Sequence, residues 1–233
     1  MIPLVLLPGM MCDARLFAPQ IAALSPRLPV MHMPMTGHDT VEALAGDILA
    51  HAPPCFALAG LSMGGIVAME VVRQASGRVD RLALLDTNPL AEKPEIQARR
   101  GPQIEAAVAG ELARVMRDEM KPHYLTDGPK KNEILDLCMD MAVGLGPQVF
   151  ADQSHALMQR PNQTDTLRAY DAPSLVLCGR DDALCPVHRH ELMHQLLPQS
   201  TLTIVEEAGH LPTLEQPEMV TDALLAWLDP ART

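Results

Sequence analysis

One serine in the sequence stands where it could become a nucleophile. Ser62 is the centre of the pattern Gly60-Leu61-Ser62-Met63-Gly64, which follows a short apolar run and opens a helical pattern. A sharp strand-to-helix turn of this kind strains the serine backbone and lifts the hydroxyl clear of a sheet. Side chains two residues before and after the serine would collide, so glycine is expected at both positions. The pattern therefore predicts a reactive serine at the start of a helix.

A serine hydroxyl needs a base to remove its proton, and two later loops offer the missing groups. Residues 179–186 contain Asp182, and residues 206–212 contain His210. Each loop follows an apolar run, and parallel sheets place their sites at the carboxyl ends of strands. The order serine, acid, histidine is the order in which such hydrolases arrange a triad. We therefore expect Ser62, His210 and Asp182 to converge at one edge of a sheet.

Two other carboxylates compete for the role of the acid. Asp181 is adjacent to Asp182, and Asp86 follows the end of an earlier apolar run. We favour Asp182 because its distances from Gly179 and from Pro186 both fit the loop pattern that hydrolases of this type use.

A second motif points to different chemistry. His190-Glu191-Leu192-Met193-His194 reads H-E-x-x-H, which in zinc peptidases places two imidazoles on one helix face with the glutamate as base. The helix connects two expected strands, so it should lie on the flank of the sheet, and no H-x-x-G-x-x-H extension follows. We therefore expect no metal, and keep a zinc metallopeptidase as an alternative from another class. A non-catalytic binding protein on a hydrolase scaffold is a further alternative.

The elements that must position these groups follow a simple alternation. Short apolar runs read as continuous rather than alternating, which is typical of strands buried on both faces of a parallel sheet. Helical patterns lie between them, and one of these has Thr40 as its expected N-cap. The expected strands are residues 2–7, 28–33, 56–61, 82–85, 174–178 and 202–205. The chain is thus predicted to be an α/β protein with a wound sheet.

Residues 88–171 break this alternation. They show helical patterns interrupted by proline and glycine, and they are too long for a plain connection. We interpret them as a helical cap over the carboxyl edge of the sheet, with residues 1–87 and 172–233 forming the core. Four polar residues of the cap could reach a substrate, although each is better explained as an exposed or capping residue: His123, Tyr124, Arg160 and Asn162.

Composition excludes several classes of function. The net charge is −11 and lysine and arginine form no cluster, which argues against nucleic acid and anionic membranes as partners. No apolar run approaches the roughly 20 residues that span a bilayer, and the N-terminus lacks the features of a signal peptide. The five cysteines are scattered without a C-x-x-C pair, so we expect reduced thiols and a cytoplasmic protein. Cys12 and Cys185 are interpreted as small apolar filler near the site.

Four motifs together resemble the α/β-hydrolase superfamily, in particular its small cofactor-free esterases, lactonases and carbon–carbon-bond hydrolases. The motifs are Leu7-Pro8-Gly9-Met10, the turn around Ser62, residues 179–186 and residues 209–217. The resemblance implies Asp182 as the triad acid and His210 as the base. It also implies an oxyanion hole made by the backbone N–H groups of Met10 and Met63.

The sequence departs from the family pattern in two ways. Pro8 stands where the family commonly has histidine, and the chain begins at the first parallel strand. We therefore expect an α/β-hydrolase fold with a shortened, mostly parallel sheet of about six strands, helices on both faces and a helical cap.

Together the residues and the resemblance predict a serine hydrolase of the carboxylesterase type. Its substrates would be small carboxylic esters, lactones or thioesters, cleaved through an acyl-enzyme without a metal or organic cofactor. The expected partner is a small-molecule acyl substrate. An acyltransferase or a lyase using the same triad is the alternative. The cap carries no motif that identifies the substrate, and the oligomeric state is open.

Overall fold

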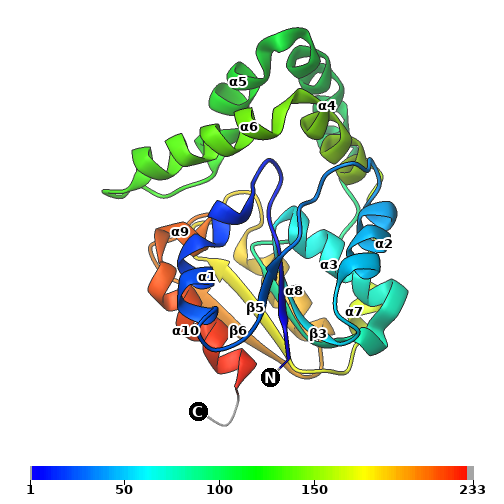
Figure 1. The fold of residues 1–233 in the computed structure, drawn as a ribbon. Coiled ribbons are helices and arrows are strands. Elements are labelled where there is room, and N and C mark those ends of the chain that lie inside the picture. The colour runs from blue at the N-terminus through cyan, green and yellow to red at the C-terminus, as the bar shows by residue number, and fades with distance from the viewer. Residues whose placement is uncertain (1, 230–233) are drawn as a thin grey trace.

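The computed structural model describes residues 2–229, and a parallel sheet runs through its centre (Figure 1). The sheet has six strands in the order β2-β1-β3-β4-β5-β6, and every neighbouring pair is parallel. The strands are β1 (Leu4–Leu7), β2 (Val30–His32), β3 (Phe56–Leu61), β4 (Val79–Leu85), β5 (Ser174–Gly179) and β6 (Ser200–Val205). All six expected strands are therefore present, and the predicted fold class is confirmed.

Continuous apolar runs produce this sheet because both of its faces are covered. Val5 and Leu7 of β1 belong to one buried cluster, whereas Leu4 and Leu6 belong to a second cluster on the opposite face. Every residue of β1, β3 and β5 is buried. Successive side chains of a strand point to opposite faces, so an alternating pattern would have left one face polar.

Helices cover both faces of the sheet, as expected. In Figure 1, α1 and α10 lie together on one side, and α2 and α3 lie together on the other. Thr40 caps α2 as predicted, because its side-chain oxygen accepts a hydrogen bond from the N–H of Ala43. The helices are α1 (Ala18–Leu24), α2 (Val41–His51), α3 (Met63–Ala75), α8 (Val187–Leu196), α9 (Pro212–Glu215) and α10 (Pro217–Leu228), with short 3-10 turns η1 (Ala14–Phe17) and η2 (Ser76–Arg78).

The segment between β4 and β5 is helical. Figure 1 shows α4, α5 and α6 as a separate layer beyond one edge of the sheet, whereas α7 packs back against α3 and α8. The helices are α4 (Pro94–Ala106), α5 (Leu112–Arg114), α6 (Lys131–Met158) and α7 (Thr164–Ala169), joined by the turns η3 (Ala107–Glu111), η4 (Val115–Met120) and η5 (Lys121–His123). The division of the chain into core and cap at residues 88 and 171 stays a prediction.

Helix α6 differs in two ways from what the sequence suggested. The sequence predicts breaks at Gly144 and at Gly146-Pro147; the first is wrong, because the helix continues through Gly144, whereas the second is present. Gly146 has φ 84° and ψ 173° and precedes Pro147, so the break lies there. By length and mean hydropathy α6 is also long and apolar enough to cross a membrane, although charged residues interrupt its apolar stretches. The break leaves no straight piece of the roughly 20 residues that a span needs.

Candidate active site

Ser62 sits in a strained turn between β3 and α3. Its φ is 55° and its ψ is −116°, a combination that non-glycine residues rarely adopt. A Cβ on Gly60 would lie 2.3 Å from the backbone carbon of Gly64, and a Cβ on Gly64 would lie 2.1 Å from the carbonyl oxygen of Leu7. Both glycines are therefore required by the close approach of the helix to β1 and β3. The turn leaves the serine only partly buried.

The structure brings the three expected side chains into one hydrogen-bonded chain. Ser62 Oγ lies 2.9 Å from Nε2 of His210, and Nδ1 of His210 lies 2.9 Å from Oδ2 of Asp182. The second oxygen of Asp182 accepts hydrogen bonds from the backbone N–H groups of Leu184 and Cys185, at 2.8 and 2.9 Å. Nδ1 of His210 therefore carries its proton toward the carboxylate, and the lone pair of Nε2 faces the serine hydroxyl.

The surroundings of Asp182 keep it charged. Burial by itself raises the pKa of this carboxyl, but His210 and the two backbone donors outweigh burial and lower the pKa below its ordinary value. An ionised acid next to Nδ1 favours the imidazolium that forms when His210 takes up a proton.

Asp86 occupies a different position from the one a triad acid needs. Its Oδ1 accepts a 2.9 Å hydrogen bond from the N–H of Gly179, and within residues 2–229 it makes no hydrogen bond to His210. Burial, and then the charge of Asp182, raises the pKa of Asp86 well above its ordinary value, so this carboxyl holds its proton to a higher pH than a free aspartic acid does. Asp181 is exposed, and among the described residues its hydrogen bond is the one from its backbone N–H to the carbonyl of Ala208.

The two expected oxyanion donors flank the serine. Met63 is the first residue of α3, and Met10 follows Gly9 in the loop after β1. Across the described part of the chain, neither backbone N–H donates a hydrogen bond. Both are free to bind negative charge, and the N-terminus of α3 adds its favourable dipole.

A glutamine that the sequence analysis did not single out holds the loop after β1. Gln153 of α6 accepts a 2.8 Å hydrogen bond from the N–H of Met11 and donates a 2.8 Å hydrogen bond to the carbonyl of Met35. Met11 has φ 56°, so this bond maintains an uncommon backbone conformation beside Met10. No motif marks Gln153, because its role depends on α6 lying over the loop.

The histidine loop is also anchored to the helical insert. Glu215 accepts hydrogen bonds from the N–H groups of Gly209 and Leu211 through one oxygen, and from Thr126 of the insert through the other. The ring of Tyr124 lies 6.0 Å from the ring of His210, measured between centroids. Tyr124 was expected to be an exposed or capping residue, and this is wrong, because its side chain is buried and its ring faces His210.

The H-E-x-x-H motif does not form a ligand set. Nε2 of His190 accepts a 3.1 Å hydrogen bond from the N–H of Thr87, whereas Nδ1 of His194 lies 2.8 Å from the hydroxyl of Ser200. Burial lowers the pKa of His190 to about 4, so its ring is neutral and supports the loop after β4. Thr87 in turn donates a 2.7 Å hydrogen bond to the carbonyl of Ser62.

Within residues 2–229, the His, Cys, Asp and Glu side chains that gather closely enough to hold a metal are Asp182, Cys185 and His210. Two of these already bind each other through a hydrogen bond. Burial raises the pKa of the Cys185 thiol well above its ordinary value, so the third is a neutral thiol and a poor ligand. The thiol of Cys12 is buried with a raised pKa as well.

Comparison with known proteins finds a hydrolase family model and several esterases similar to this chain. A model described as "Alpha/beta hydrolase family" matches residues 4–223. A pimeloyl-[acyl-carrier protein] methyl ester esterase from Aromatoleum aromaticum is 29% identical, over 86% of this chain and 89% of its own length. Esterase YbfF from Escherichia coli is 27% identical, over 88% of this chain and 78% of its own. A thermophilic esterase from Thermogutta terrifontis, solved with malate bound, is 30% identical with a TM-score of 0.91, over 100% of this chain and 91% of its own.

Proposed function

Because the chain belongs to the alpha/beta hydrolase family and is a carboxylesterase-type hydrolase, we propose that Ser62, His210 and Asp182 are its catalytic residues. The observation that carries this proposal is the chain of contacts from Ser62 Oγ through His210 to Asp182, with both distances at 2.9 Å. The substrates are small carboxylic esters, lactones or thioesters. Relatives named for a methyl ester favour simple alkyl esters among these.

The reaction proceeds through an acyl-enzyme. Ser62 Oγ attacks the carbonyl carbon of the ester while Nε2 of His210 takes the hydroxyl proton, and the carbonyl becomes a tetrahedral oxyanion. The carbon–oxygen bond to the leaving alcohol then breaks, and His210 returns the proton to that alcohol. Water attacks the acyl-serine with His210 again as base, which releases the acid and restores the hydroxyl.

The remaining groups lower the barrier by electrostatics and positioning. The N–H groups of Met10 and Met63 donate hydrogen bonds to the oxyanion, which carries full negative charge only after the attack. Asp182 orients the imidazole and stabilises its charged form. No step in this sequence requires a metal or an organic cofactor.

The proposal is tested with a short p-nitrophenyl ester such as the butyrate. Ser62→Ala should lower kcat/KM by at least about 10³-fold while the thermal melting curve stays that of the wild type. Ser76→Ala is the matched control, because Ser76 is an exposed serine at the opposite end of α3 and should leave the rate unchanged. Activity retained by Ser62→Ala would contradict the assignment.

The same experiment separates the alternatives that share this site. With an added alcohol or amine, an acyltransferase forms a new ester or amide in preference to the free acid, whereas a hydrolase releases the acid. A binding protein with a silent triad neither turns over the ester nor reacts with a fluorophosphonate, because that probe labels only an activated serine.

A further inference from the structure

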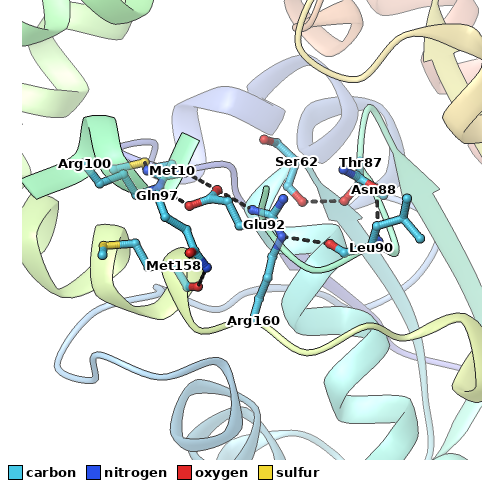
Figure 2. Close-up of polar contacts among 10 residues, drawn as sticks. All are labelled: Met10, Ser62, Thr87, Asn88, Leu90, Glu92, Gln97, Arg100, Met158 and Arg160. Atoms are coloured by element: carbon cyan, nitrogen blue, oxygen red, sulfur yellow. Dashed lines mark hydrogen bonds and ion pairs between the residues drawn. The ribbon is translucent and has the colours of Figure 1, made fainter. Parts of the chain in front are cut away.

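The helical insert contains a buried cluster of one carboxylate and two guanidinium groups. Glu92 is 2% exposed through its side chain, and Arg100 and Arg160 are each 11% exposed. The carboxylate of Glu92 accepts hydrogen bonds from Nε and Nη2 of Arg100, at 2.6 and 2.8 Å, and from Nη1 of Arg160 at 2.7 Å (Figure 2). Two guanidinium cations face one carboxylate, so the cluster carries one excess positive charge.

This cluster adjoins the proposed catalytic groups. Nη1 of Arg100 lies 3.8 Å from the sulfur of Met10, whose backbone N–H is a proposed oxyanion donor. Burial raises the pKa of the Cys185 thiol and the nearby charge of Arg160 lowers it, and the sulfur of Cys185 lies within 4.8 Å of the ligand atoms of Asp182 and His210. In Figure 2, Ser62 lies on the Arg160 side of Glu92.

One guanidinium group keeps donors that the protein does not use. Arg160 donates Nε–H to the carbonyl of Leu90 at 3.1 Å and donates from Nη1 to Glu92. Its second terminal nitrogen, Nη2, has no acceptor among the described residues and is not one of the solvent-shielded polar atoms. This nitrogen therefore keeps some exposed surface and hydrogens that an acceptor could bind. Burial lowers the pKa of Arg160 in spite of Glu92, which indicates that its charge is incompletely compensated.

A purely structural role does not account for the second arginine. One arginine already binds Glu92 through two parallel hydrogen bonds, which is the strong geometry for such a pair. Burying another cation costs desolvation free energy that a carboxylate already bound elsewhere cannot fully repay. The cluster lacks one anion, and the planar guanidinium fork is best matched by a carboxylate.

We propose that Arg160, held by Glu92 beside Arg100, binds a carboxylate on the ester substrate. The enzyme would then prefer half-esters of dicarboxylic acids, or esters of hydroxy acids, to neutral esters of the same size. This inference rests on the proposed function, because it assigns the substrate class of the same site.

The test compares matched esters that differ in one charge. In the first pair, mono-p-nitrophenyl glutarate carries a carboxylate on the acyl side and p-nitrophenyl butyrate is its neutral partner. In the second pair, 4-acetoxybenzoate carries a carboxylate on the alcohol side and phenyl acetate is its neutral partner. In at least one pair the wild type should prefer the charged ester. Arg160→Gln should lower kcat/KM for that ester by roughly 10- to 100-fold and change the rate on its neutral partner by less than about threefold.

Three further variants separate recognition from folding. Arg160→Lys keeps the charge without the fork and should retain part of the preference. Glu92→Gln leaves both cations uncompensated and should increase the preference, which a merely damaged cap cannot do. Arg168→Gln removes the same charge from α7, where the side chain is 60% exposed and paired with Asp165, and should leave the preference unchanged.

The proposal would be overturned if Arg160→Gln left the ratio of kcat/KM for the charged ester to kcat/KM for the neutral ester unchanged in both pairs. An equal loss of kcat/KM on both members of a pair would overturn it as well. Wild-type protein that cleaves none of the four esters would contradict the proposed function instead. Calorimetric titration with glutarate then tests the carboxylate site by itself: binding by the wild type that Arg160→Gln loses supports the site, and equal or no binding by both overturns it.

Discussion

The backbone N–H of His210 donates a 2.7 Å hydrogen bond to the backbone carbonyl of Tyr124. His210 follows β6, whereas Tyr124 belongs to the helical insert, so the proposed base is positioned by both parts of the chain. The helical insert therefore helps to position His210.

This contact makes Gly209 sensitive to substitution. A Cβ at Gly209 would lie 2.7 Å from the carbonyl oxygen of Tyr124, and the backbone at Leu125 is also close, at 3.1 Å. Gly209→Ala should therefore displace His210 and lower kcat by roughly 10-fold or more in an esterase assay, since misplacing a catalytic group by about 1 Å costs about that or more. Gly46→Ala, at an exposed position in α2, should keep full activity and stabilise the fold by about 0.5–1 kcal/mol. A Gly209→Ala enzyme with wild-type kcat would show that this contact is dispensable.

Replacing each buried carboxyl, Asp182 or Asp86, with asparagine should have very different effects on kcat. Asp182→Asn removes the charge next to His210 and should lower kcat by about 10⁴-fold. Asp86→Asn keeps an amide oxygen that can accept from the N–H of Gly179, and it leaves the bond between His210 and Asp182 in place, so kcat should change by less than about threefold. An equal loss in both variants would make Asp86 an ionised partner in catalysis.

Asp86 also affects stability. Its pKa is raised on folding, so the folded state holds a proton that the unfolded chain releases above about pH 4, and stability falls as the pH rises from there. Asp86→Asn removes this pH-dependent loss of stability. The variant should therefore be at least as stable as the wild type at pH 7, measured by urea unfolding.

His190 should contribute to destabilisation by acid. Its pKa is about 4 when folded and 6.5 when free, so the unfolded chain binds the proton more readily and stability is lost as the pH falls from about 6.5 to 4. The loss is of the order of 3 kcal/mol at about 1.4 kcal/mol per pKa unit. His190→Gln keeps an acceptor for Thr87 and should show a smaller difference between unfolding free energies at pH 7 and pH 4.5. His123→Gln, on an exposed residue, should keep the wild-type difference. If the unfolding free energy changed by the same amount between pH 7 and pH 4.5 in all three proteins, His190 would not have this role.

Removing metal ions should not affect activity. The Nε2 lone pair of His190 accepts from the N–H of Thr87, and Nδ1 of His194 is bonded to Ser200, so each histidine of the motif already has a partner other than a metal. Enzyme dialysed against EDTA should keep its wild-type rate on p-nitrophenyl butyrate. A loss that added zinc restores would revive the metallopeptidase interpretation.

Local patterns were sufficient to predict the sheet and the turn at Ser62. The central strands β1 and β3 are continuous apolar runs, and the requirement for Gly60 and Gly64 arises from backbone contacts within the strand–turn–helix unit and its neighbouring strand. Both Asp182 and Asp86 follow strands, and the spacing of Asp182 from Gly179 and Pro186 favours it, as does its hydrogen bond to His210 in the structure.

The contributions of the insert could not be predicted in this way. Gln153, Tyr124 and the Glu92 cluster act through contacts with segments distant along the chain, and no residue spacing encodes how the insert lies on the core. Gly110, where φ is 98°, likewise interrupts the helical segment between α4 and α5 with no proline beside it.

The central claim is that Ser62 carries the acyl group during turnover, and trapping that intermediate tests it most directly. Wild-type enzyme mixed with p-nitrophenyl butyrate, quenched in acid and digested, should yield a peptide containing Ser62 that is heavier by one butyryl group. Ser62→Ala should give no such peptide and no turnover. A butyryl group on another residue, or turnover by Ser62→Ala at the wild-type rate, would contradict the account.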